Sequence, residues 1–268
     1  MSRPPIILCS GSLGSIELSQ KIEAAAEAGF DGISVYGNEV RAAVEAGIDC
    51  GSLAADLGLM VAEVDGVVVT SRSTEHFDEA LDIADRMAAR SITMVETRAY
   101  DPADDRQVSK AAEVFGELCD RAALAGRLVH IEPFAWSSLG RTADAAEIVR
   151  RAGRPNGGLL FDLWHHVRGP DQGVLDDTID VASIFEIQLA DTHATAWPNT
   201  RDECMTSRLL PGHGHADLAP RLRALAAGGP LPPVGIEVFG TELDRLTPVD
   251  AARTARDALT SVFDAAGV

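Results

Sequence analysis

The sequence predicts a single (β/α)8 barrel over residues 1–268, and three observations favour this fold class. Eight short apolar runs recur along the chain, and segments with helical spacing separate them. No Ser/Pro-rich linker and no change of composition divides the 268 residues. Eight such alternations in roughly 250 residues are typical of one barrel, whereas two smaller doubly wound domains would require a boundary.

The eight runs are each the length of a buried strand and are mostly apolar on both faces, as parallel strands covered by helices should be. The predicted strands are Ile6–Ser10, Gly32–Tyr36, Leu59–Val64, Ser91–Glu96, Leu128–Pro133, Gly158–Asp162, Ile184–Ala190 and Val234–Val238.

The segments between the strands show helical periodicity, and several follow a threonine that can cap a helix: Thr74, Thr142 and Thr247. The clearest predicted helices are Ile16–Ala28, Glu75–Ala89, Gln107–Ala125, Ala143–Ala152, Leu218–Ala227 and Pro248–Ala265. Weaker patterns at Val40–Leu57 and Gln172–Ala182 supply the remaining helices. Gly11–Gly14 gives only a broken version of the glycine-rich turn that a dinucleotide-binding sheet would carry.

Composition and charge exclude several function classes. The chain has 41 acidic and 23 basic side chains, a formal net charge of −18, which opposes binding to nucleic acid or to anionic lipid. No apolar run approaches the roughly 20 residues of a membrane span, and Met1–Ile6 does not resemble a signal peptide, so a cytoplasmic location is expected. The four cysteines are scattered and form no Cys-x-x-Cys pair.

Polar side chains stand at the ends of the last four predicted strands, where the chemistry of such barrels takes place. These are Glu132, Asp162, Gln188 and Glu237. For one carboxylate alone, a capped strand end or a pair with arginine is an equal alternative. Three carboxylates buried together require a compensating charge, so the set predicts one divalent metal ion. The oxygen-rich ligands favour Mn²⁺ or Mg²⁺, with Co²⁺ or Zn²⁺ as further possibilities.

These motifs resemble the xylose isomerase-like barrel superfamily of sugar phosphate isomerases and epimerases over nearly the whole chain. The resemblance places the four residues above on the metal-ligand positions, and Pro211–Gly214 is similar to the superfamily's Pro-Gly-x-Gly turn. Gln188 is similar to the branch that contains 3-dehydroshikimate and inosose dehydratases. In that branch, the resemblance implies proton transfer by His165 and contact between Arg208 and a polar or anionic substrate group. Asp65–Val69 departs from the branch, which carries an arginine there, and His213 replaces a frequent acid.

The expected chemistry is removal of a proton next to a carbonyl, with an enediolate stabilised by the cation. The candidate catalytic residues are Glu132, His165 and Glu237. The candidate substrate-binding residues, besides Arg208, are Trp136, Trp164 and His166; for His166 and the tryptophans, packing is an equal alternative. His130 is expected to be a satisfied core histidine rather than a ligand.

The sequence thus predicts a metal-dependent isomerase or epimerase of a small sugar-like or cyclic hydroxyketone. One alternative is a dehydratase of a keto-cyclitol, because epimerisation, isomerisation and dehydration share the same intermediate. A second alternative is a barrel that binds a metabolite without catalysis. A DNA-repair endonuclease of the same superfamily is disfavoured by the acidic charge. A small molecule is the expected partner, and the outer helices could form a homodimer.

Overall fold

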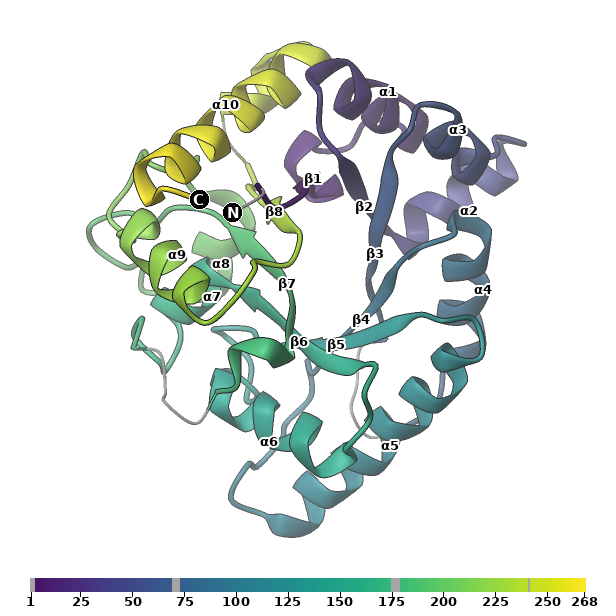
Figure 1. Ribbon diagram of the computed structural model, residues 1–268, viewed down its shortest axis with the longest axis vertical. Coiled ribbons are helices and arrows are strands. Elements are labelled where there is room, and N and C mark those ends of the chain that lie inside the picture. Colours follow the sequence, from purple (N-terminus) through teal and green to yellow (C-terminus); the bar gives the residue numbers. More distant parts are fainter. Residues whose placement is uncertain (1–2, 69–72, 175–178, 241) are drawn as a thin grey trace.

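The computed structural model describes residues 3–68, 73–174, 179–240 and 242–268, and these form one closed parallel barrel inside a ring of helices (Figure 1). Neighbouring strands pair in chain order, and the first strand pairs with the eighth through the register Ile7↔Gly235. The predicted fold class is therefore confirmed. Within the described ranges, no helix is both long and apolar enough to cross a membrane.

The strands lie close to their predicted positions. They are β1 (Ile6–Leu8), β2 (Gly32–Tyr36), β3 (Met60–Val68), β4 (Ser91–Val95), β5 (Leu128–Glu132), β6 (Gly157–Asp162), β7 (Ile184–Leu189) and β8 (Val234–Ile236). The main difference is at β3, which continues past Val64 and carries Asp65 in register with Tyr36 of β2. This difference matters because it adds a carboxylate to the interior that the shorter predicted strand excluded.

The outer helices are α1 (Leu18–Ala28), α2 (Gly37–Glu45), α3 (Cys50–Asp56), α4 (Phe77–Met87), α5 (Asp105–Ala123), α6 (Thr142–Ala152), α7 (Leu163–Arg168), α8 (Thr200–Thr206), α9 (Leu218–Ala227) and α10 (Pro248–Ala266). Short 3₁₀ turns occupy Ser10–Leu13, Val181–Ser183 and Glu242–Arg245. The weak pattern at Val40–Leu57 is two helices, because the chain turns at Gly47, which has a positive φ.

Two local predictions were wrong. The helix predicted at Gln172–Ala182 is not present in the part of that segment that the structure describes; α7 instead begins directly after β6, because the Asp162 side chain accepts hydrogen bonds from the first backbone amides of the helix. Thr74 and Thr142 are not caps, since His76 and Arg141 precede α4 and α6. Thr247 does cap α10, accepting from Asp250 N, with Pro248 at the first helical position.

Apolar side chains fill the space between the barrel and its helices, and polar side chains fill much of the barrel interior. The buried polar residues inside the strands include Glu63, His130, Glu186 and Gln188. Side chains two residues apart on a strand share a face, so His130 lies one layer below Glu132, and Glu186 one layer below Gln188. Asp162 and Gln188 face each other in register on β6 and β7, at the rim where the strands end.

Candidate active site

The ends of β5 and β6 bring three predicted site residues together. Glu132 ends β5, Asp162 ends β6, and His165 lies in the first turn of α7. His165 Nε2 is 3.7 Å from Glu132 Oε1 and 3.8 Å from Asp162 Oδ2, and one ligand atom from each residue lies within 4.8 Å of the other two. All three side chains are almost fully buried. The placement of His165 follows from the Asp162 cap, which fixes the start of α7 at the rim.

Arg208 links this group to the end of β8. Its Nη1 donates to Asp162 Oδ2 at 2.7 Å and to Glu237 Oε2 at 3.0 Å. The guanidinium lies between the rings of Trp164 and Phe239, 4.9 Å from each centroid. Arg208 is only 1% exposed, and its buried charge is stabilised both by these carboxylates and by the two aromatic rings. Its charge compensates carboxylates from two different strands.

Gln188 and Glu237 complete the predicted set but face different partners. Gln188 Nε2 donates to Glu63 Oε1 at 2.9 Å, and Glu237 Oε1 is 3.4 Å from the Tyr36 hydroxyl. Among the described residues, neither Gln188 Oε1 nor Glu132 Oε1 has a hydrogen-bond partner, although both atoms are buried. Buried acceptors are normally satisfied, so these two oxygens are available to a ligand.

Burial controls the protonation of the site. It raises the pKa of Glu132 well above its usual range, and it raises the pKa of Glu237 to about 7 against the opposing influence of Arg208. Burial also lowers the pKa of His165 to about 3, so this imidazole is neutral. The buried carboxyl groups of Glu132, Asp162 and Glu237 thus outnumber the single buried cation beside them, Arg208. Unpartnered oxygens beside buried carboxylates fit a divalent cation, which would relieve this excess of negative charge.

A hydrogen-bond donor faces each ring nitrogen of His165. The backbone amide of Ala135 donates to Nδ1 at 3.1 Å, and this amide is fixed by the chain. Arg208 Nη2 lies 3.1 Å from Nε2, the nitrogen that also faces Glu132 and Asp162. A neutral imidazole accepts a hydrogen bond at only one ring nitrogen, so the Ala135 amide and Arg208 Nη2 compete for this role, and Nη2 also donates to Cys204 Sγ at 3.1 Å.

The other predicted substrate-binding residues are placed differently. Trp164 is fully buried behind Arg208, and His166 turns away from the group toward Asp171, with Nδ1 3.3 Å from Oδ2. Trp136 is half-buried and packs on Phe134, whose ring also lies 4.9 Å from that of His165. Of the three, only Trp136 combines partial exposure with proximity to the His165 ring.

Two residues near the site were missed by the sequence analysis. Tyr36 ends β2 beside Glu237, and Asp65 is buried on β3, where burial raises its pKa well above the usual range. A cavity of about 420 Å³ opens beside both residues. The signal for Asp65 was its spacing of two residues from Glu63, which places both side chains on one face. The rest of the unusual loop, residues 69–72, lies outside the described residues.

Asp191 holds the predicted Pro-Gly turn. Its two carboxylate oxygens accept from Thr192 N, Gly212 N and Ala216 N at 2.8–3.0 Å. Asp191 also forms a β-bridge with Leu209, the residue that follows Arg208, and so helps to position the segment that carries Arg208. Asp191 is thus a loop cap, and His213 is exposed to solvent on the turn.

A closed parallel barrel with buried carboxylates, a histidine and an arginine at its strand ends defines the class of (β/α)8 barrels that carry a polar site at the carboxyl-end rim. The family model for xylose isomerase-like TIM barrels matches residues 22–262. The chain belongs to this family, as the sequence motifs indicated.

Relatives in this family are enzymes. The chain is 28% identical over 243 residues to a 3-dehydroshikimate dehydratase of Pseudomonas aeruginosa, covering 85% of this chain and 38% of that protein. It is 34% identical over 119 residues to an inosose isomerase of Halalkalibacterium halodurans, covering 44% of this chain and 41% of that protein. The match thus spans less than half the length of each of these two curated relatives.

A solved structure with the same fold is that of the IOLI protein with a bound zinc atom. The two superpose with a TM-score of 0.82 at 21% identity, covering 96% of this chain and 97% of the other. At this identity the likeness shows the fold alone.

Proposed function

We propose that the protein is a divalent-metal-dependent isomerase or epimerase of a small sugar-like or cyclic hydroxyketone. The observation that carries this proposal is the convergence of Glu132, Asp162 and His165 at the rim, joined to Glu237 through Arg208. Buried carboxylates around a neutral histidine can move a proton to and from carbon, provided that a positive charge stabilises the oxyanion.

The residues that would hold the ion are Glu132, Asp162, Gln188 and Glu237. The unpartnered oxygens of Glu132 and Gln188 support this assignment. A divalent cation, when bound, supplies positive charge to the oxygen of a substrate carbonyl whose neighbouring C–H loses its proton. Mn²⁺ or Mg²⁺ suits an all-oxygen set.

The chain's own residues divide the proton transfers between them. Glu132 and Glu237 come from β5 and β8, which are three strands apart in the barrel, so they approach a substrate from different sides. One of them, as the carboxylate, removes the proton from one face of the carbon, and the other, as the carboxylic acid, returns a proton to the opposite face, as epimerisation requires. His165 Nε2 faces these carboxylates and exchanges a proton with a substrate oxygen in this proposal.

Arg208 and Trp136 bind the substrate in this proposal. Arg208 Nη1 holds Asp162 and Glu237, whereas Nε has no hydrogen-bond partner among the described residues and can donate to a substrate oxygen. The half-buried Trp136 ring offers an apolar wall that excludes water. Trp164 acts by supporting the Arg208 guanidinium from behind, and His166 by holding Asp171.

Dehydration of a keto-cyclitol is the second candidate reaction. The similarity to a 3-dehydroshikimate dehydratase over 85% of this chain favours it. It begins with the same proton removal and differs in the loss of a hydroxyl group from the neighbouring carbon. A proton donor beside the carboxylates, such as His165, suits this step, because a departing hydroxide requires a proton.

Exchange of substrate C–H for solvent deuterium tests the proposal. A panel of keto-sugars and keto-cyclitols is incubated in D₂O with Mn²⁺ and followed by NMR. We expect exchange with the wild-type protein, none with Glu237→Gln, and exchange slower by about 100-fold or more with His165→Ala. The exposed His213→Ala variant is the matched control and should exchange at the wild-type rate.

The products separate the candidate reactions. Exchange with a new epimer or ketose supports the isomerase, and an enone selects the dehydratase. If no member of the panel exchanges, while one of them raises the melting temperature, the barrel binds a metabolite without catalysis. Full exchange in both variants would refute the assigned roles.

A further inference from the structure

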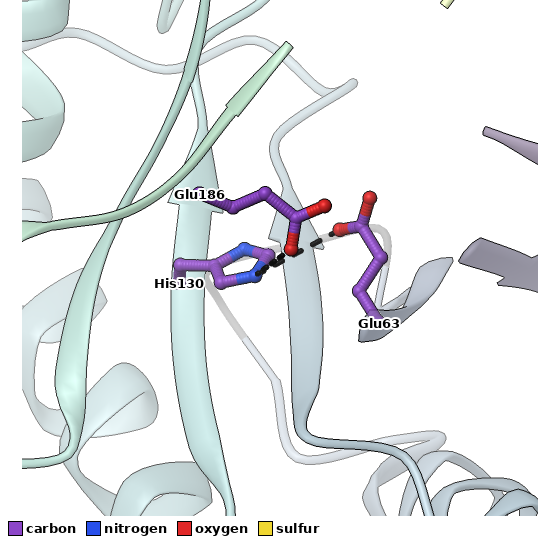
Figure 2. A group of neighbouring side chains, drawn as sticks. All are labelled: Glu63, His130 and Glu186. Carbon is purple, nitrogen blue, oxygen red and sulfur yellow. Dashed lines mark ion pairs between the residues drawn. The ribbon is translucent and has the colours of Figure 1, made fainter. Parts of the chain in front are cut away.

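A second group of metal-ligating side chains lies inside the barrel, below the rim site. Glu63 from β3, His130 from β5 and Glu186 from β7 point toward one another (Figure 2), and each is fully buried. The group shares no residue with Glu132, Asp162 and His165. It lies one layer deeper, because His130 precedes Glu132 by two residues.

The spacing of the group suits a single ion. His130 Nε2 is 3.8 Å from Glu63 Oε2 and 3.9 Å from Glu186 Oε2, and the three ligand atoms lie within 4.8 Å of one another (Figure 2). Zinc bonds of about 2.0–2.2 Å hold ligand atoms roughly 3–4 Å apart. An inward shift of a few tenths of an ångström for each side chain would therefore close the group around an ion.

The carboxylate of Glu186 gives independent evidence that this group binds a ligand. Neither of its carboxylate oxygens has a hydrogen-bond partner among the described residues, although the side chain is 0% exposed. Glu63, by contrast, accepts from the Thr93 hydroxyl and from Gln188 Nε2. A buried carboxyl group without hydrogen bonds is costly, and Glu186 points at the space that it shares with His130 (Figure 2).

We propose that Glu63, His130 and Glu186 bind a structural Zn²⁺ ion in the core of the barrel. Two carboxylates balance the charge of a divalent cation, and an imidazole nitrogen with two carboxylate oxygens is a ligand set that zinc accepts at low coordination number. Mg²⁺ and Mn²⁺ retain several waters in octahedral sites, for which an enclosed group of fully buried side chains gives little room. The Ser91 hydroxyl, 2.9 Å from His130 Nε2, is placed to be a fourth neighbour.

Neighbouring side chains orient the three ligands. The Thr93 hydroxyl contacts Glu63 and lies 3.4 Å from His130 Nδ1, so one residue of β4 positions two ligands. Glu63 in turn holds Gln188 Nε2, which leaves Gln188 Oε1 free. An ion in the core would tie β3, β5 and β7 together and would fix the side chain of a proposed rim ligand.

Zinc stoichiometry tests the inference with a readout other than activity. Wild-type protein, Glu186→Gln and Glu132→Gln are stripped of metal, refolded with Zn²⁺, desalted and measured by elemental analysis, with circular dichroism as the check on folding. We expect two ions in wild type and one in each variant, because Glu186 belongs to the core group and Glu132 to the rim.

The outcomes separate the two sites. One ion in wild type that Glu132→Gln removes and Glu186→Gln retains would overturn the core site and leave the rim site intact. One ion that only Glu186→Gln removes would support the core site and contradict the rim. If Glu186→Gln does not fold, zinc-edge X-ray absorption of the Glu132→Gln protein decides: one histidine and two carboxylates at about 2.0–2.2 Å support the inference, and zinc without histidine refutes it.

Discussion

Replacing Arg208 with methionine tests the electrostatic account of the rim. The substitution removes the buried cation that pairs with Asp162 at 2.7 Å and Glu237 at 3.0 Å, and it keeps an unbranched side chain between the Trp164 and Phe239 rings. Breaking a buried ion pair by removing one partner costs about 3–5 kcal/mol, because the other charge is left buried. We expect metal-free Arg208→Met to lose about this much unfolding free energy at pH 8.

Urea unfolding at two pH values measures the effect. The loss should shrink at pH 5, because carboxyl groups that have taken up protons no longer require a cation, and burial already raises the pKa of Glu237 to about 7. Arg154→Met is the control: its partner Asp120 is exposed, and such pairs contribute roughly 0–1 kcal/mol. Equal losses in the two variants, or a loss at Arg208 that does not depend on pH, would refute the reasoning.

Two further predictions concern the barrel core and the packing of the outer helices. Burial raises the pKa of Glu186 from 4.5 to about 8 in the metal-free protein, so between these values the folded state holds a proton that the unfolded state has lost. Unfolding free energy should therefore fall from pH 5 to pH 8 more steeply in wild type than in Glu186→Gln, and identical slopes in urea titrations would contradict this. Gly51→Ala places a methyl group against the backbone carbonyl of Arg86 and should destabilise the protein by about 1–3 kcal/mol. In Gly47→Ala the new methyl group meets no atom within 4 Å, so the substitution should lower the unfolding free energy only by the roughly 1 kcal/mol that a positive φ costs alanine. Thermal melts that rank Gly47→Ala as the less stable variant would disprove the packing argument.

The fold could be predicted because its signals are local and repeated. Each buried parallel strand is a short apolar run, and the barrel rule then places Glu132 and Asp162 at one rim. The structure adds His165 to this pair, as the resemblance implied, because α7 starts at Asp162.

The partners of each side chain could not be predicted, because they depend on contacts distant in sequence. Arg208 bonds Asp162, which lies 46 residues away, and Gln188 bonds Glu63 across 125 residues. Neither strand periodicity nor a motif encodes such pairs. His130 was expected to be a satisfied core residue. It does have Ser91 as a hydrogen-bond partner, but its carboxylate neighbours come from strands that the sequence could not place beside it.

The central proposal is that the rim carboxylates hold one divalent ion. Crystals grown with Mn²⁺, with anomalous diffraction recorded at the manganese edge, test it most directly. We predict an anomalous peak bonded to oxygens of Glu132, Asp162, Gln188 and Glu237, and none there in Glu132→Gln crystals. Manganese-saturated wild-type crystals without a peak at these four side chains would contradict the proposal.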